Sequence, residues 1–459
     1  MARLSEIFAD YVLNYSIETV SPKAKEQALM FFQDCFGCML AGSTEPAVKL
    51  VRNYGSSLHS KPSATVFGVN NLKTDPATAA MINGTAAHIH DYDDVSTSVT
   101  GHPSVVVLPT VLAVGEDLWS TGQDVLEAYM VGIEVMGLAG RGMNPQHYSK
   151  GWHNTATLGV FGSTAAAGKL LKLSRQQLIY AFGIAASRAS GLKGNFGTMT
   201  KSLHAGLAAS NGIFAAKMAK LGFDSNPDIF EMSGGFVPVT TGECNTQKII
   251  DFIASGMSEF LKPGLACKPF PSCKATHNGI NAAMDLHREY KFSVDDITSI
   301  DVECQPIAKD LLKYPEAKTP LQGKFSMNYC IACGLVNGKV SLSDFEGTEI
   351  TNPQILSLMK KIHMEVSEGI SGGEYFNGTW ETAVGITLNN GQRLYKRVRY
   401  ATGDPENPLN AEKISEKFLD CISRIVNLKN AHQLLYDINH LESLSCISHL
   451  AVDVQESLL

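Results

Sequence analysis

Histidines and aspartates gather between residues 88 and 102, where the sequence reads HIHDYDDVSTSVTGH. Side chains of these types can bind a metal, exchange protons, or end a helix at a solvated surface. His88 and His90 have the spacing of the HxHxDH metal hydrolases, but that motif requires aspartate and histidine where this chain has Tyr92 and Asp93. A metal hydrolase is therefore kept only as an alternative.

Asp91 and His102 lie on either side of a short loop, so their side chains could share one cavity. A carboxylate beside an imidazole holds its tautomer and favours its protonated form. Because anions are disfavoured at a helix C-terminus, the acidic cluster is poorly placed for stability alone. We predict that Asp91 orients His102 and that His102 carries a proton. A solvated helix end beside a loop histidine is the alternative. Since successive helical residues point about 100° apart, His88 and His90 are expected to tolerate substitution.

Glycines, a lysine and a histidine form a second cluster in residues 191–204, which read GLKGNFGTMTKSLH. Glycines let backbone N–H groups approach a ligand, and a helix N-terminus favours anions. With the charge of Lys201 and with His204 nearby, this cluster is typical of a cradle for a carboxylate or phosphate. The GxxxxGK[ST] spacing of a P-loop is absent. The alternative is a flexible loop with a solvated lysine.

Lys268, Lys274 and His277 form a third cluster, KPFPSCKATH, where one predicted domain gives way to another. Cations at such a boundary could clamp an anionic substrate. His153 lies just before another predicted helix. Each histidine alone would more often be structural, but together with Lys201 they suit a small polycarboxylate. The same set would serve an enzyme or a non-catalytic polycarboxylate-binding protein.

The elements that must position these residues change in character along the chain. Residues 1–265 are rich in alanine, glycine and methionine, with repeated helix starts such as Asp75-Pro76. Residues 266–400 contain strand patterns, two of them joined through Asn390-Gly391, a strong hairpin signal. A helical pattern resumes over residues 401–459. We predict a mainly α fold: a large all-helical domain built from both chain ends, with a smaller inserted α+β lid domain.

Composition narrows the class of protein. The 459 residues are 44% hydrophobic and 18% charged, as in globular enzymes, and the net charge of -7 gives no reason to expect nucleic acid or an anionic membrane as partner. No run of 18 apolar residues occurs, and the N-terminus lacks a signal-peptide pattern. Ten cysteines in mostly apolar segments indicate reduced thiols and a cytoplasmic location. The CFGC and CIAC pairs are expected to be buried hydrophobes, with a Cys₄ zinc site as the alternative.

With these clusters in hand, the chain resembles the MmgE/PrpD family. The resemblance covers nearly the whole chain and is carried by HxxDYDD…GHPS, GTMTKSLHAG, FPSCKATH and GDPENPL. It implies a helical domain with an α+β lid, a homodimer, a small polycarboxylate substrate, and no required metal or cofactor. The family includes cis-aconitate decarboxylase, 2-methylcitrate dehydratase and iminodisuccinate epimerase.

The resemblance also implies site residues, position by position. Those matching the decarboxylase's active site are Asp91, His102, Lys201, His277, His153 and, in FSMNYCIAC, Tyr329. Lys274, Lys268, His204 and Ser96 are expected to contact the substrate. Two departures affect the choice of reaction: Val95 stands where the decarboxylase has threonine, and the loop from Asp94 to His102 is one residue longer.

These reactions share the need to stabilise negative charge on a carbon next to a carboxylate. Fixed cations around the carboxylates meet that need, and a histidine that titrates near neutrality moves the proton. The sequence therefore predicts a cofactor-independent lyase acting on a small di- or tricarboxylate, most like the decarboxylase. A dehydratase of the 2-methylcitrate type and a dicarboxylate epimerase are the alternatives.

Overall fold

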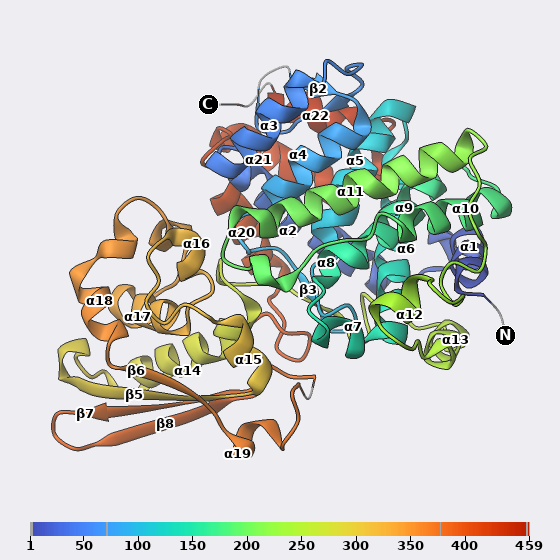
Figure 1. Ribbon diagram of the computed structural model, residues 1–459. Coiled ribbons are helices and arrows are strands. Elements are labelled where there is room, and N and C mark those ends of the chain that lie inside the picture. Colours follow the sequence, from blue (N-terminus) through green and yellow to red (C-terminus); the bar gives the residue numbers. More distant parts are fainter. Residues whose placement is uncertain (1–2, 70–71, 377, 456–457, 459) are drawn as a thin grey trace.

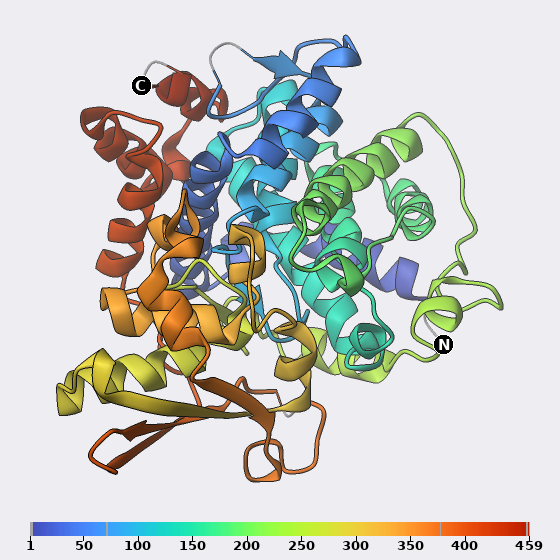
Figure 2. The same ribbon diagram turned by 60° about the vertical axis from the view of Figure 1, so that its left-hand side comes forward.

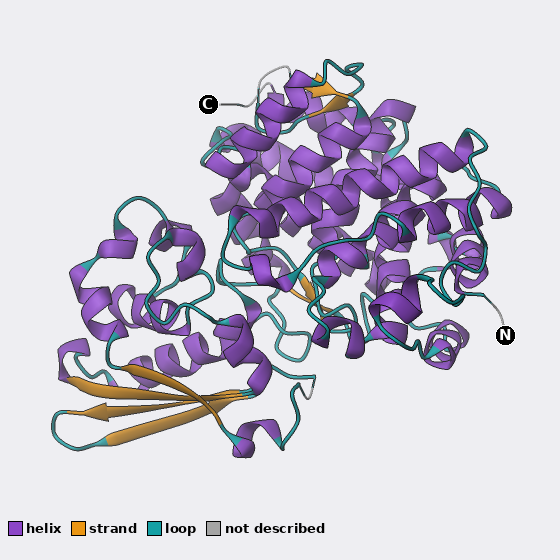
Figure 3. Cartoon of the chain, viewed as in Figure 1, coloured by secondary structure: helices purple, strands orange, loops and turns teal. Residues whose placement is uncertain are grey.

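The computed structural model describes residues 3–69, 72–376, 378–455 and 458. The fold is mainly helical, with a small mixed sheet in the C-terminal region, which confirms the predicted mainly α class (Figure 3). Within the described residues, no helix is both long and apolar enough to cross a bilayer.

Long buried helices form the larger part of the molecule, here called the helical part (Figure 1). Their starts follow the sequence signals: the Asp75 side chain accepts hydrogen bonds from the N–H groups of Ala77 and Thr78, and Pro76 occupies the first turn. The helices of this part include α1 (Leu4–Asn14), α2 (Pro22–Gly42), α3 (Pro46–Ser57), α4 (Pro76–His88), α5 (Ser104–Leu118), α6 (Gly122–Met143), α9 (Gly159–Leu170), α10 (Arg175–Ala186), α11 (Met199–Lys220) and α13 (Thr246–Ala254).

Glycine brings α4 and α11 close enough to share the site. A Cβ on Gly84 would lie 2.9 Å from the Cα of Gly206, so the two backbones meet where neither helix has a side chain. This contact places the end of α4, at His88, beside the first turn of α11, which carries Lys201.

The C-terminal helices return to the helical part. Helix α20 (Ala411–Ile422) packs against α2, and α21 (Leu428–Asn439) also contacts α2. Figure 2 shows these red helices beside the blue N-terminal ones. Phe418 and Ile422 belong to the same hydrophobic core as Phe32 and Phe36. Both ends of the chain therefore contribute to one core.

Residues 270–398, here called the C-terminal unit, form a second core. Its four-stranded sheet has the order β6-β5-β7-β8, with β6 (Ile362–Val366) parallel to β5 (Ile297–Cys304) and the other pairs antiparallel. Strands β7 (Thr382–Leu388) and β8 (Arg393–Val398) form the hairpin predicted at Asn390-Gly391. Helix α14 (Lys274–Tyr290) packs on β7 and β8, and α17 (Met327–Asn337) packs on α14.

Two adjacent segments connect this unit to the helical part. The backbone N–H of Cys267 donates to the carbonyl of Gly403 at 2.9 Å, so the outgoing and returning chains run side by side. Gly403 has a positive φ of 91°, and a Cβ there would collide with the carbonyl of Cys267. Next to this crossing, β3 (Val95–Ser96) pairs with β4 (Leu265–Ala266).

Candidate active site

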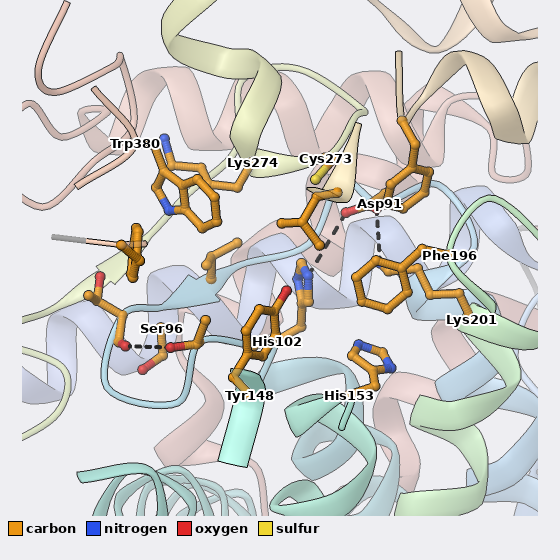
Figure 4. A pocket seen from close by; sticks show the side chains of 17 residues that line it. Asp91, Ser96, His102, Tyr148, His153, Phe196, Lys201, Cys273, Lys274 and Trp380 are labelled. Atoms are coloured by element: carbon orange, nitrogen blue, oxygen red, sulfur yellow. Dashed lines mark hydrogen bonds and ion pairs between the residues drawn. The ribbon is translucent and has the colours of Figure 1, made fainter. Parts of the chain in front are cut away.

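A cavity lies where the helical part meets the C-terminal unit, and Figure 4 shows its lining. The empty space there is about 520 Å³, a figure that includes space open to solvent, and only about 40 Å³ of it admits the centre of a water molecule. The polar side chains that line it come mainly from the helical part, whereas Lys274, Phe376 and Trp380 come from the C-terminal unit. The predicted residues that line it are Asp91, Ser96, His102, His153, Lys201 and Lys274.

Asp91 is turned into the site by an unusual backbone conformation. Helix α4 ends at His88, and Asp91 has a φ of 52°, in the left-handed region that few non-glycine residues adopt. Its Oδ2 lies 2.9 Å from Lys201 Nζ, and Lys268 Nζ pairs with Oδ1 and donates to the Asp91 carbonyl at 2.9 Å. Burial opposes ionisation, but the two lysines outweigh it and hold the pKa of Asp91 well below its usual range.

His102 is held from behind by Asp93 and Asp94, not by Asp91 as the sequence predicted. Its Nδ1 lies 2.9 Å from the Asp94 carbonyl and 2.9 Å from Asp93 Oδ2. Both of these oxygens accept, so Nδ1 carries the proton and Nε2 is left for the cavity. Nε2 lies 4.0 Å from Asp91 Oδ1. Burial lowers the pKa of His102 despite the opposing charge of Asp93, which leaves a neutral imidazole with its Nε2 lone pair toward the cavity.

His88 belongs to the same network, although its substitution was expected to be tolerated like that of His90. Lys201 Nζ lies 2.9 Å from His88 Nε2, and His88 Nδ1 lies 3.0 Å from each Asp93 oxygen. An ammonium only donates, so Nε2 accepts and Nδ1 donates to Asp93. The helix-angle argument failed because α4 ends at His88 and Asp91 is no longer helical. His90 faces away, with Nε2 3.3 Å from the carbonyl of Ala41.

His153 and His204 form a neutral pair at another side of the cavity. Their Nδ1 atoms lie 3.0 Å apart, so one ring donates and the other accepts. Burial lowers the pKa of both rings, to about 4 for His204. Within the described residues, the buried Nε2 of His153 has no hydrogen-bond partner. A substrate oxygen could supply one, because His153 lines the cavity and His204 lies behind it.

The remaining predicted residues lie at different depths. Lys274 lines the cavity and pairs with Asp404 at 2.8 Å, whereas Lys268 is fully buried beneath Asp91. His277 is also buried, with Nε2 3.2 Å from the carbonyl of Ser272, and it does not line the cavity. The structure therefore brings Lys274 to the cavity surface but not His277 or Lys268.

Tyr329 is not brought to the site. Its side chain is buried in the core of the C-terminal unit, its ring lies 5.6 Å from that of Phe345, and its hydroxyl donates to the carbonyl of Asp344. The reason is that α17 turns this face toward its own core, where Gly323 leaves room for the ring.

Sequence reasoning missed Asp93, His88 and the aromatic wall. The signal for Asp93 was present: it lies two residues after Asp91, beyond the end of a helix, where the backbone rather than helical periodicity decides which carboxylate meets His102. The wall residues lie far apart in the sequence, so only the fold assembles them: Tyr148, Phe196, Phe325, Phe376 and Trp380.

Within the part of the chain that the structure describes, His88, Asp93 and His102 are the group that could hold a metal ion, because one ligand atom from each lies within 4.8 Å of the others. In the observed arrangement both Nδ1 atoms face Asp93, so shared protons already satisfy this carboxylate. A cation would have to displace them next to the Lys201 ammonium, 2.9 Å from His88. The donor set therefore suits proton exchange better than metal binding.

Comparison with known proteins covers most of the chain. The model of the MmgE/PrpD N-terminal domain matches residues 6–248, and that of the C-terminal domain matches residues 270–439. The cis-aconitate decarboxylase of Homo sapiens is 28% identical over 97% of this chain and 93% of its own length. That of Aspergillus terreus is 24% identical over 95% of this chain and 93% of its own length. The mitochondrial 2-methylcitrate dehydratase of Yarrowia lipolytica is 27% identical over 86% of this chain and 79% of its own length. On these matches, the chain belongs to the MmgE/PrpD family.

Proposed function

We propose that the protein is a cofactor-independent lyase acting on small carboxylates, most like a cis-aconitate decarboxylase. The observation that carries this proposal is the His102 imidazole, fixed at Nδ1 by Asp93 and Asp94, with Nε2 directed to a cavity that also contains Lys201 and Lys274. A titratable nitrogen beside ammonium groups is the arrangement needed to move a proton on a carbon flanked by carboxylates.

In the proposed decarboxylation, the bond between a carboxylate and its neighbouring carbon breaks and CO₂ leaves. The released electron pair forms a new double bond, and the pair of the old double bond moves to the carbon next to a second carboxylate. His102 gives its Nε2 proton to that carbon, and solvent restores the proton. The bound substrate supplies the negative charge that raises the pKa of His102 enough to load Nε2 before the step. Lys201 stabilises the developing charge.

Dehydration or epimerisation is the second candidate, and one observation favours it. His102 is neutral before substrate binds, because burial lowers its pKa. A neutral imidazole is the base form, which abstracts a proton from carbon as those two reactions require.

Proton NMR in deuterated water separates the candidates. The purified protein is incubated with cis-aconitate, 2-methylcitrate and citrate in turn. Decarboxylation of cis-aconitate should yield a product with one deuteron on the newly protonated carbon. Formation of an alkene from either hydroxy acid would select dehydration, and exchange without CO₂ or water loss would select epimerisation. No change in any of the three would reject the proposed substrate class.

A further inference from the structure

The walls of the cavity are apolar to an extent that the proposed chemistry does not require. The apolar side chains that line it are Val95, Tyr148, Phe196, Leu311, Phe325, Phe376 and Trp380. They also approach the charged groups closely: Lys201 Nζ lies 5.5 Å from the ring centre of Phe196 and 5.3 Å from that of Phe325. The Phe376 and Trp380 rings lie 4.8 Å apart and form one apolar surface on the C-terminal unit.

The charge of the site is already balanced before any substrate enters. Among the described residues, Lys201 and Lys274 are the lysines that line the cavity, and no arginine does. Lys201 and Lys268 share Asp91, Lys274 pairs with Asp404, and the carboxylate of Asp93 lies beside His88 and His102, so three carboxylates stand against three ammonium groups. A ligand with three negative charges would lose its bound water on entering the cavity. The described residues provide no three free cations to take the place of that water, so binding would carry a large cost in free energy.

The histidines do not supply the missing charge at rest. Burial lowers the pKa of His102, His153 and His204, so these rings are neutral until an anion arrives. A bound anion can protonate His102, which the mechanism uses. The two lysines and a protonated His102 can therefore bind one or two carboxylates, and the apolar wall faces the rest of the ligand.

The chemistry also requires only two carboxylates. One leaves as CO₂, and the other, next to the carbon that is protonated, takes up the developing charge. A third carboxylate forms and breaks no bond, so another group can stand in its place without changing the electron balance.

We propose that the preferred substrate is a dicarboxylate that carries an apolar arm, alkyl or aryl, where a tricarboxylate carries its third carboxylate. This inference rests on the proposed function. The two carboxylates lie toward Lys201 and Lys274, and the arm packs against Phe376 and Trp380.

Two unreactive ligands that differ only in this arm test the inference. Tricarballylate is glutarate with a carboxyl group on its central carbon, and 3-phenylglutarate is glutarate with a phenyl group on the same carbon. Calorimetric titration of the full-length protein should show 3-phenylglutarate binding about tenfold or more tighter, because burial of one aromatic ring is worth at least that factor. Equal affinity, or tighter binding of tricarballylate, would overturn the inference.

Matched variants locate the arm. Trp380→Ala should weaken binding of 3-phenylglutarate about tenfold while changing that of tricarballylate little, since the proposal assigns the indole to the arm alone. Tyr395→Ala removes an exposed aromatic ring from β8, outside the cavity, and should change neither affinity. A Trp380→Ala protein that loses both ligands equally, or neither, would contradict the assigned position of the arm.

The two proposals fail in different ways. If tricarballylate binds more tightly and cis-aconitate is turned over, the proposed function stands and the apolar arm is rejected. If 3-phenylglutarate binds more tightly but no unsaturated dicarboxylate or tricarboxylate is turned over, the binding preference stands and the lyase is rejected. If neither ligand binds, the apolar arm is rejected, and turnover of cis-aconitate alone decides the proposed function.

Discussion

At the scale of single residues, the site depends on which acceptor each imidazole nitrogen faces. Asp93 lies between His88 and His102, and Asp91 lies between two lysines. Residues of the same type, two positions apart, therefore have different tasks. Asp93 fixes tautomers, whereas Asp91 pairs with two ammonium groups and faces the cavity.

Asp93→Asn tests the first task. An amide can present its N–H to His102 Nδ1, which would place the proton on Nε2 and reverse the tautomer. We expect kcat to fall by about two to four orders of magnitude, the usual effect of a misdirected catalytic histidine. Nitrogen-15 NMR of the His102 ring should show the changed tautomer. Asp420→Asn, on the exposed face of α20, is the control. Unchanged turnover in Asp93→Asn would contradict the orienting role.

Lys201 is the charged group expected to act on both binding and the barrier. Lys201→Ala should lower kcat/KM by a factor equivalent to about 2–4 kcal/mol of lost transition-state stabilisation, because the deleted group stabilises developing negative charge. Steady-state kinetics measures the change. Lys217→Ala, on the same helix but in a partly exposed pair with Asp117, should leave kinetics unaltered. Equal kinetics for both variants would remove Lys201 from the mechanism.

At the scale of elements, the sequence predicted those features that depend on interactions between neighbouring residues. The Pro and Asp signals at Asp75-Pro76 fix the start of α4, and Asn390-Gly391 fixes the hairpin. The left-handed turn at Asp91 could not be predicted, because its stabilising partners lie 110 and 177 residues away. Nor could the inward position of Tyr329, which depends on how α17 packs on the rest of its unit.

Helix α20 supports the acidic loop from the far end of the chain. Lys417 Nζ lies 2.7 Å from Asp34 Oδ1 on α2 and donates to the carbonyl of Tyr92 at 2.7 Å. Both side chains are buried, so Lys417→Met should lower the free energy of unfolding by about 3–5 kcal/mol by leaving Asp34 unpaired. Denaturant titration measures this. The double variant Lys417→Met/Asp34→Leu should recover much of the loss, and additive losses would contradict the pairing.

A buried histidine between elements also makes the free energy of unfolding depend on pH. His147, in α7 (Gln146–Ser149), contacts Thr157 and Thr241 at 2.8 and 2.9 Å, and burial lowers its pKa from 6.5 to about 4. As the pH falls, His147 therefore takes up a proton near pH 6.5 in the unfolded chain but only near pH 4 in the native state. Unfolding free energy should fall as pH falls through this window, by up to about 3 kcal/mol for this residue.

His147→Gln keeps a donor and an acceptor but cannot titrate. The difference in unfolding free energy between wild type and variant should therefore change between pH 6.5 and 4 and stay constant above pH 7.5. A pH-independent difference would show that His147 titrates equally in both states.

At the scale of the whole molecule, the site lies between two cores, so the substrate must enter between them. We propose that residues 266–400 act as a lid that moves relative to the helical part. Hydrogen exchange should slow in the segments around Leu311 and Trp380, which line the cavity, when 3-phenylglutarate or tricarballylate is bound. Exchange in the centre of α6 should remain unchanged. Identical exchange throughout, with either ligand bound, would reject the moving lid.

The paired crossing at Cys267 and Gly403 has a consequence for how such a protein can diversify. Because the outgoing and returning chains meet in one hydrogen bond, the span between them can lengthen, shorten or change sequence without displacing the helices on either side. Asp91, His102 and Lys201 belong to the helical part, whereas Phe376 and Trp380 lie within the span. Lys268 also lies within the span and holds Asp91, so it has to be kept when the span changes. Evolution can thus preserve the proton-transfer groups and Lys268 while the surface that selects among carboxylates changes independently.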